Sequence, residues 1–247
     1  MDEIIQSVAN EQVKKWGKLH QKKYRDEYGL FLVEGEHLTE LALTTGCVEH
    51  LLILSGLDHI WVNHPAKVSV SQAILDKLSQ SVSGTNIIAV CRLVKTVPNK
   101  MERVIVLDSI QDPGNLGAII RCAVSFGYDC LILSPQCVDA YNDKCIRSTQ
   151  GACFMIPIVR QELTEAISFL KQQGVEILVT ALTEATPLKE VNSSTKSHAL
   201  VLGNEGSGVS SSVMALADQK ITIEMKQFES LNVAVAAGIC MYMLQQE

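Results

Sequence analysis

A glycine-rich loop that contains a single carboxylate is the first feature of this sequence suited to binding chemistry. In VLGNEGSGVS (201–210) three glycines fall within six residues, and Glu205 lies among them. Glycine loops that follow a strand let a ligand approach the bare backbone, and many of them bind phosphate. This loop has no lysine, and Glu205 would repel a phosphate. The residues therefore argue against a phosphate site and leave the ligand open.

Two further segments place polar side chains among apolar neighbours. SIQDPGNLGAIIRCA (109–123) has a turn followed by a predicted helix, which Asn115 can cap. Within that helix Arg121 is either a surface residue whose stem lies along the sheet or a guanidinium directed at an anionic or polar substrate group. ESLN (229–232) precedes a helix of small residues, VAVAAGICMYM, which is suited either to a plain core or to close packing in a dimer.

Two runs of alternating strands and helices supply the elements that would position these segments. The first run has strands at 29–35, 50–55 and 86–94 and helices at 10–23, 36–44 and 71–80. Proline and polar residues then mark a linker at 94–103. The second run has strands at 103–107, 130–134, 154–158, 176–180, 199–203 and 220–224, and helices near 115–126, 143–149, 162–173, 209–217 and 231–245.

The strands of the second run are rich in valine, isoleucine and leucine, which predicts a parallel sheet covered on both faces. Ligands of such sheets bind beyond the carboxyl ends of the strands. The loop at 201–210, the segment 109–123 and the segment 221–238 all follow strand ends. We therefore expect these three segments to form one site.

Composition limits the function classes. The chain has 247 residues, of which 47% are hydrophobic, and a net charge of −6, as in an ordinary globular protein. The apolar run at 232–244 is too short to span a bilayer. None of the eight cysteines lies in a C-x-x-C pair, which argues against structural zinc and favours reduced thiols in a cytosolic protein. A nicotinamide-dependent dehydrogenase would need G-x-G-x-x-G after its first strand, and this sequence has no such motif there.

One stretch near the N-terminus is strongly basic, although the chain as a whole has a net negative charge. QVKKWGKLHQKKYR (12–25) contains six lysines or arginines and no acid. It is either a solvated helix face or a surface that contacts RNA phosphates, in which Trp16 and Tyr24 would suit stacking on unpaired bases.

Taken together, in this order and spacing, the three segments resemble the SpoU (TrmH-like) branch of the SPOUT RNA 2′-O-ribose methyltransferases. DPGNLGAIIR is similar to the first family motif, LGNEGSGVS to the second, and ESLNVAVAAGI to the end of the third. Residues 139–158 are similar to the intermediate R-S-x-x-G stretch. The third motif departs from the family pattern: IEMKQFESLN lacks the usual proline and glycine and is one residue shorter.

The resemblance implies two α/β domains. Residues 1–97 would form a small L30e-like domain that binds the RNA substrate. Residues 98–247 would form the SPOUT catalytic domain, a parallel-sheet domain with a deep trefoil knot that binds S-adenosylmethionine among its knotted loops. The resemblance also implies a cytoplasmic homodimer that pairs through the 231–245 helix and the first-motif helix, without a metal and away from membranes.

The resemblance also assigns residues. The catalytic set is Asn115, Arg121, Glu205, Ser230 and Asn232. The cofactor-binding set is Thr180, Ala181, Leu202, Gly203, Asn204, Gly206, Ile223, Met225, Ser230 and Leu231. The residues expected to contact RNA are Lys14, Lys15, Lys18, Lys22, Lys23, Arg25 and Arg147.

Methyl transfer to a ribose hydroxyl is an in-line displacement that needs the 2′-oxygen positioned and its proton removed. A guanidinium has a pKa above about 12, so we expect Arg121 to bind the ribose or an adjacent phosphate, with Glu205 as a positioning group. The expected substrate is large-subunit (23S) ribosomal RNA. The alternatives are a tRNA 2′-O-methyltransferase and a non-catalytic RNA-binding or ribosome-assembly protein that keeps the fold.

Overall fold

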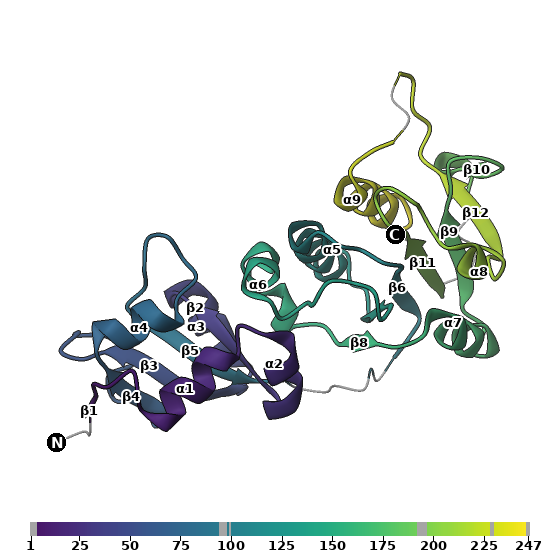
Figure 1. The fold of residues 1–247 in the computed structure, drawn as a ribbon. Coiled ribbons are helices and arrows are strands. Elements are labelled where there is room, and N and C mark those ends of the chain that lie inside the picture. Colours follow the sequence, from purple (N-terminus) through teal and green to yellow (C-terminus); the bar gives the residue numbers. More distant parts are fainter. Residues whose placement is uncertain (1–3, 94–97, 99, 192–196, 228–229, 246–247) are drawn as a thin grey trace. The chain divides into compact units, whose positions relative to one another are not determined.

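A computed structural model of the chain describes residues 4–93, 98, 100–191, 197–227 and 230–245 (Figure 1). The chain divides into two compact units, each built on its own sheet. The first comprises Met1–Val94 and Tyr141–Phe154, and the second comprises Lys95–Ala140 and Met155–Glu247. Within the described residues, no helix has the length and apolar character needed to cross a bilayer.

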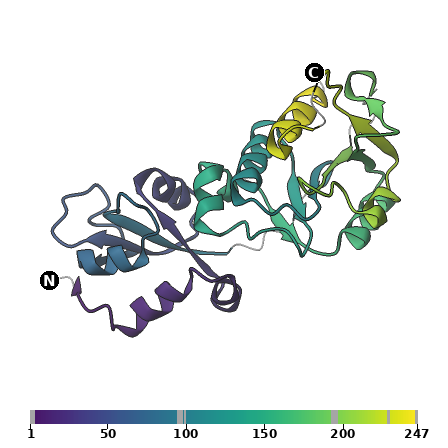
Figure 2. The same cartoon turned by 45° about the horizontal axis from the view of Figure 1, so that its top comes forward.

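The first unit is a five-stranded mixed sheet with the order β1-β4-β3-β5-β2. Figure 2 shows the ribbon from a second direction. Its elements are β1 (Ile4–Ile5), α1 (Glu11–Lys18), α2 (Lys22–Tyr28), β2 (Leu30–Glu34), α3 (Glu36–Thr44), β3 (Val48–Leu54), β4 (Lys67–Val70), α4 (Gln72–Leu78), β5 (Ile87–Arg92), α6 (Asp143–Thr149) and the 3-10 turn η1 (Ala152–Phe154). The strand β5 pairs antiparallel with β2 and β3, whereas β4 pairs parallel with β1 and β3. The short strands β1 and β4 were not predicted from the sequence.

The basic stretch near the N-terminus forms two helices, so the prediction of one helix over 10–23 is wrong. Asn10 caps α1 as its position predicts, because its Oδ1 accepts hydrogen bonds from the backbone of Gln12 at 2.8 Å and Val13 at 3.4 Å. Gly17 lies in the last turn of α1 and weakens the helix there. The chain then turns, which brings Leu19 into the core with only 2% of its surface exposed.

The second unit is a seven-stranded sheet with the order β10-β12-β9-β11-β6-β7-β8. Its elements are β6 (Arg103–Leu107), α5 (Pro113–Ser125), β7 (Cys130–Leu133), β8 (Ile158–Arg160), α7 (Leu163–Gln172), β9 (Glu176–Thr180), β10 (Thr186–Pro187), the 3-10 turn η2 (Leu188–Glu190), β11 (His198–Leu202), α8 (Ser211–Met214), β12 (Gln219–Thr222) and α9 (Val233–Met243). Every pair of neighbouring strands is parallel, which confirms the predicted parallel sheet. The trefoil knot stays a prediction that rests on the family resemblance.

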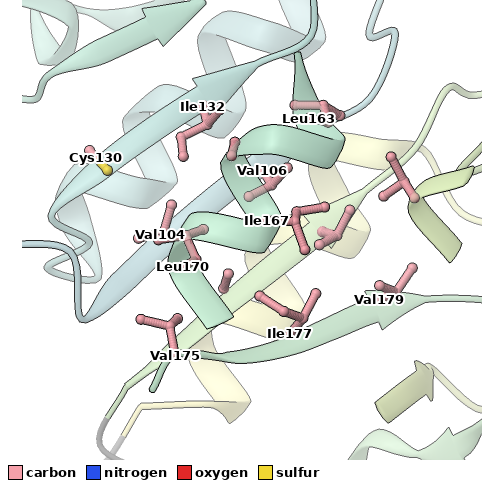
Figure 3. Close-up of a cluster of buried hydrophobic side chains, with 14 residues drawn as sticks. Val104, Val106, Cys130, Ile132, Leu163, Ile167, Leu170, Val175, Ile177 and Val179 are labelled. Carbon is pink, nitrogen blue, oxygen red and sulfur yellow. The ribbon is translucent and has the colours of Figure 1, made fainter. Parts of the chain in front are cut away.

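Both faces of this parallel sheet are buried. On one face α7 packs Leu163, Ile167 and Leu170 against strand residues that include Val104 and Ile177 (Figure 3). The neighbouring strand residues, which point to the opposite face, are buried as well: Ile105, Leu107, Leu131, Leu178 and Leu200. The helices α5 and α9 contact each other, and they contact β7 and β11 respectively. Burial on both faces explains why these strands read as continuous apolar runs.

The strand predicted at 154–158 begins later, at Ile158, and the preceding residues 152–154 form a 3-10 turn. Pro157 explains the shift, since proline has no backbone N–H to donate to a strand ladder. Its carbonyl still accepts a hydrogen bond from the backbone of Leu131 at 2.9 Å. The guanidinium of Arg160 donates to four backbone carbonyls, those of residues 134, 135, 137 and 138.

The segment Tyr141–Phe154 lies in the chain between β7 and β8, yet it packs within the first unit. The ring of Phe31 on β2 contacts those of Tyr141 and Phe154, with ring centres 4.9 Å and 6.2 Å away. Gly151, the glycine of the R-S-x-x-G stretch, has φ +91°, and a Cβ there would lie 2.3 Å from Leu41. The positive φ therefore favours glycine at 151, whereas the nearest atom, Leu41 Cδ1, is the end of a flexible side chain.

A buried histidine makes the stability of the second unit depend on pH. His198 is 2% exposed, its Nε2 lies 2.9 Å from the Tyr128 hydroxyl, and burial together with Arg103 lowers its pKa from 6.5 to about 4. The neutral ring is favoured in the fold, so its contribution is complete above pH 6.5 and is lost as the pH falls toward 4.

Between pH 7 and pH 5, we expect the free energy of unfolding to fall by about 2 kcal/mol more in the wild type than in His198→Gln. Urea unfolding of both proteins at the two pH values measures the difference. Equal losses in the two proteins would show that His198 does not carry this pH dependence.

Candidate active site

Three segments that are distant in sequence are joined by the side chain of Asn115. Its Nδ2 donates to Glu205 Oε1 at 2.8 Å, and its Oδ1 accepts from Asn232 Nδ2 at 2.9 Å. The expectation that Asn115 caps its helix is wrong, because Asp112 Oδ1 accepts the backbone N–H of Asn115 at 2.9 Å and caps α5 instead. Capping by Asp112 leaves the Asn115 amide available to the site. The predicted meeting of the three segments is therefore observed.

The side chains of Asn232, Asn115 and Glu205 form a hydrogen-bonded chain, and the groups at its two ends set the direction of both hydrogen bonds. The Glu205 carboxylate only accepts, so Asn115 presents its amide nitrogen to it and its oxygen to Asn232. Asn232 must then donate with its nitrogen, and its oxygen caps α9 by accepting from the backbone of Ala234 at 2.9 Å and Val235 at 3.3 Å. The arrangement fixes both amides without ambiguity.

Asn204 shapes the glycine loop around Glu205. Its Oδ1 accepts from the backbone N–H of Gly206 at 2.9 Å and of Ser207 at 3.1 Å, which folds the loop back on itself. Its Nδ2 donates to the carbonyl of Ser109 at 2.9 Å and so ties the loop to the end of β6. Asn204 and Gly208 also exchange two backbone hydrogen bonds, at 3.0 and 2.9 Å. The loop is thus held in shape by hydrogen bonds within the chain.

Asp108 is a positioning residue that the sequence reasoning missed. It is 5% exposed, its Oδ2 accepts the backbone N–H of Ser210 at 2.9 Å, and its Oδ1 accepts the Ser109 hydroxyl at 3.0 Å. Ser109 has φ +61°, a conformation that few residues other than glycine adopt. The sequence did contain a signal for this role: Asp108 directly follows the apolar strand RVIVL. A carboxylate at the end of a buried strand needs hydrogen-bond partners.

Gly203 is the point of closest approach in the loop. A Cβ at this position would lie 2.2 Å from the carbonyl carbon of Gly208 and the backbone nitrogen of Val209. Real side chains essentially never approach backbone atoms this closely, so only glycine fits here.

A cavity of about 370 Å³ opens beside this loop. All ten residues predicted to bind the cofactor line it: Thr180, Ala181, Leu202, Gly203, Asn204, Gly206, Ile223, Met225, Ser230 and Leu231. Glu205 lines it too, which connects the cavity to the Asn115 hydrogen bonds. Apolar residues that were not predicted, including Met214, Val233 and Cys240, complete its wall. Burial raises the pKa of the Cys240 thiol to about 12, so this group stays neutral.

Two predicted catalytic residues lie outside the hydrogen-bonded chain. Ser230 lines the cavity, and its neighbours at 228–229 in the shortened third motif fall outside the described residues. Arg121 is exposed on α5, six positions after Asn115 and about 9 Å further along the helix axis. Within the part of the chain that the structure describes, its guanidinium makes no hydrogen bond or ion pair. It is therefore free to bind an anionic group.

The residues predicted to contact RNA fall in different environments. Five of them are exposed on α1 and α2: Lys14, Lys15, Lys18, Lys22 and Lys23. The prediction for Arg25 is wrong, because this residue is 5% exposed and its Nη1 donates to the carbonyl of Leu19 inside the unit. Stacking by Trp16 is excluded likewise, because its ring is 2% exposed and packs 5.4 Å from His50. On α6, Arg147 forms an ion pair with Asp143 at 2.8 Å and remains partly exposed.

Comparison with known families assigns both parts of the chain. The family model described as the SpoU rRNA methylase family matches residues 102–242. A second model, described as the MRM3-like substrate binding domain, matches residues 10–89.

Individual relatives match almost the whole length. The 23S rRNA (guanosine(2553)-2′-O)-methyltransferase RlmP of Bacillus subtilis is 38% identical over 248 residues, which is 98% of each chain. The crystal structure of an AdoMet-bound rRNA methyltransferase from Sinorhizobium meliloti superposes with a TM-score of 0.87 at 26% identity, covering 98% of this chain and 97% of that one. The structure of an RNA 2′-O ribose methyltransferase superposes with a TM-score of 0.80 at 28% identity over 98% of both chains.

Gly203 and Gly206 provide a matched pair for testing the loop. In Gly203→Ala the new methyl group must displace the backbone at 208–209, so we expect affinity for S-adenosylmethionine to fall by about tenfold or more. In Gly206→Ala the Cβ meets Asn204 Oδ1 at 3.5 Å, an ordinary contact, so affinity should change less than about threefold. Isothermal titration measures both, and equal affinities for the two variants would contradict the close-approach role of Gly203.

Proposed function

This chain belongs to the SpoU rRNA methylase family, and from that premise we propose that it transfers a methyl group from S-adenosylmethionine to a ribose 2′-hydroxyl of large-subunit (23S) ribosomal RNA. The family predicted from the three motifs is confirmed by the family model and by the 38% identical relative. The observation that carries the proposal is the Asn232–Asn115–Glu205 hydrogen-bonded chain, which ends at a cavity of about 370 Å³.

The lining of the cavity fits S-adenosylmethionine in its chemistry. Apolar side chains such as Leu202, Ile223 and Leu231 suit the adenine ring. Gly203 lines the cavity, and because it has no side chain the backbone of residues 208–209 can fold against it, which shapes the loop beside the cavity. The carboxylate of Glu205 is compatible with a cationic sulfonium, whereas it would repel a phosphate. When bound, this cofactor supplies a methyl group that is already activated for transfer.

The residues of this chain contribute by positioning. Asn115 and Glu205 are rigidly oriented, because both ends of the Asn115 amide are hydrogen-bonded. These groups would fix the ribose hydroxyl relative to the cavity, and orientation of this kind can supply roughly 7–11 kcal/mol of a barrier. Ser230 lines the same cavity and adds a hydroxyl that can accept or donate a hydrogen bond.

Arg121 is assigned to the RNA. Its guanidinium is exposed and makes no ion pair within the described residues, so it is available to bind the ribose or an adjacent phosphate. A guanidinium stays protonated in proteins, which suits binding of an anion better than abstraction of a proton. Glu205, already engaged by Asn115, acts as a positioning group.

The N-terminal part, residues 1–97, is assigned to RNA recognition, and residues 98–247 to catalysis. The match of residues 10–89 to a substrate-binding domain supports this division. We assign phosphate contacts chiefly to Lys15, Lys18 and Lys23, which are exposed. Lys14, Lys22 and Arg147 are at least partly exposed too, but each is already ion-paired with a carboxylate of its own helix, so they contribute less. The site of action that follows from a ribosomal RNA substrate is the cytoplasm.

A homodimer formed through α9 and α5 is part of this proposal. The outer face of α9 exposes large apolar side chains at helical spacing: Val235 is 52% exposed, Ile239 36% and Tyr242 64%. A contiguous apolar stripe of this kind is typical of a surface that pairs with another protein. Tyr242 also contacts Phe126 beside the end of α5, with ring centres 6.2 Å apart, which extends the stripe toward α5.

We expect the protein to transfer labelled methyl from S-adenosylmethionine to 23S ribosomal RNA isolated from a strain that lacks this gene. The label should survive alkali as a 2′-O-methyl nucleotide. Arg121→Ala should abolish turnover and change cofactor affinity by less than about threefold, because Arg121 lies outside the cavity lining. Arg121→Lys keeps the positive charge but loses the planar guanidinium, so its turnover should lie between that of the wild type and that of Arg121→Ala.

More than a tenth of wild-type activity in Arg121→Ala would remove this residue from the mechanism. Label in tRNA alone would support the tRNA methyltransferase alternative. Cofactor binding without transfer to either RNA would support a binding or assembly protein.

The oligomeric state can be tested by substitutions that place negative charges on the apolar stripe of α9. The double variant Val235→Asp/Tyr242→Asp should sediment as a monomer, whereas the wild type should sediment as a dimer. Phe169→Asp on α7 is the matched control, since Phe169 is an apolar side chain of similar exposure, 47%, on a different helix. A wild-type chain that is monomeric and active in sedimentation and transfer assays would contradict the dimer.

A further inference from the structure

The basic residues at the N-terminus divide into two electrostatic classes. Lys14 forms an ion pair with Glu11 at 2.7 Å, and Lys22 forms one with Asp26. By contrast, Lys15, Lys18 and Lys23 form no ion pair with any residue that the structure describes. The positive charge available to an external partner is therefore concentrated on these three lysines.

The three unpaired lysines surround two tyrosine rings. The ammonium of Lys15 lies 5.1 Å from the ring centre of Tyr28. Those of Lys18 and Lys23 lie 5.3 and 5.6 Å from the ring centre of Tyr24. The two rings are themselves stacked, with centres 5.8 Å apart and planes inclined by 30°. We call these five residues, which join α1 to α2, the lysine–tyrosine cluster.

Cation–π attraction at these distances orders the ammonium groups without neutralising them. Three like charges held close together raise one another's energy, and a carboxylate partner would relieve this repulsion. The chain as a whole carries a net charge of −6, so the concentration of unneutralised lysines is local. At physiological ionic strength, salt screens charges that lie more than about 8 Å apart. A partner bound at the cluster therefore interacts mainly with the nearby lysines and only weakly with the acidic remainder of the protein. The cluster is thus suited to a polyanion.

The aromatic rings distinguish between polyanions. Tyr24 and Tyr28 are only partly buried. A flat ring edge or face next to lysines suits an unpaired nucleotide, whose base can stack while its phosphate meets an ammonium. Bases in a duplex are already stacked on each other and are not available to the rings. An acidic peptide offers charge and no planar group. The residues therefore favour single-stranded RNA.

We propose that the lysine–tyrosine cluster on α1 and α2 binds an unpaired strand of RNA, with Lys15, Lys18 and Lys23 contacting its phosphates and the two tyrosines contacting its bases or riboses. This inference rests on the proposed function, because it identifies the single-stranded part of that RNA substrate as the element held by the N-terminal unit. Lys14 and Lys22, whose charges are paired, contribute little.

The test compares two double variants of the full chain that each remove one lysine from α1 and one from α2. Lys18→Gln/Lys23→Gln removes both ammonium groups over Tyr24, and Lys14→Gln/Lys22→Gln removes the paired ones. The probe is a fluorescent oligouridine of twelve nucleotides, and its affinity is measured by anisotropy between 50 and 200 mM salt. Each phosphate contact on a single strand contributes about 0.7 to the slope of log K against log salt.

For Lys18→Gln/Lys23→Gln the slope should therefore fall by about 1.4 and the affinity at 150 mM salt by about tenfold. The Lys14→Gln/Lys22→Gln variant should change the slope by less than about 0.5. Tyr24→Leu keeps every charge, so it should leave the slope unchanged and weaken binding severalfold, whereas Tyr24→Phe keeps the ring and should bind like the wild type. Thermal unfolding of each variant confirms that the unit is folded.

Equal losses in the two lysine pairs would overturn the inference, because they would indicate a general basic surface. Tighter binding of a duplex of the same length, or of an oligoglutamate, would overturn it in favour of another partner. Methyl transfer separates this inference from the proposed function. A wild-type chain that binds oligouridine through the cluster and methylates no RNA refutes the proposed function alone. Normal transfer with an unchanged KM in Lys18→Gln/Lys23→Gln refutes the cluster alone.

Discussion

The site depends on one hydrogen-bonded chain whose direction is fixed at both ends. At one end the carboxylate of Glu205 can only accept, and at the other the N-terminus of α9 can only donate. Asn115 and Asn232, between them, each have a donor and an acceptor and could be turned either way in isolation. Because both ends are fixed, the amides have one orientation, and Asn115 is joined to two segments that lie 90 and 117 residues further along the sequence.

This chain would not hold its geometry without a second set of contacts behind it. Asp108 is buried at the end of β6 and fastens the beginning of the first segment to the end of the glycine loop, through Ser109 and Ser210. Asn204 adds a further link by bonding the Ser109 carbonyl and two backbone N–H groups of its own loop. A buried carboxylate with hydrogen-bond partners is costly to disturb, so Asp108 keeps the end of the loop fixed to the end of β6.

Much of the fold of the second unit could be predicted from the sequence, for a physical reason. The strands of the second unit are buried on both faces, so β6 and β9 are continuous apolar runs whose limits the sequence marks clearly. What could not be predicted depended on tertiary contacts. Asn115 was expected to cap a helix, but Asp112 does so. Arg25 and Trp16 were considered for RNA contact, and both are buried. Trp16 shares the buried face of α1 with Val13, and Arg25 is turned inward to the carbonyl of Leu19, which follows the end of α1.

The return of Tyr141–Phe154 to the first unit has a consequence for how this protein can be divided. The polypeptide crosses between the two units three times, so one cut in the linker does not yield two complete parts. A catalytic fragment made alone would keep Tyr141 and Phe154 but lose the Phe31 ring that packs against both of them. The N-terminal unit is therefore not an interchangeable cassette, and a chimera that replaces it must also supply a matching 141–154 segment.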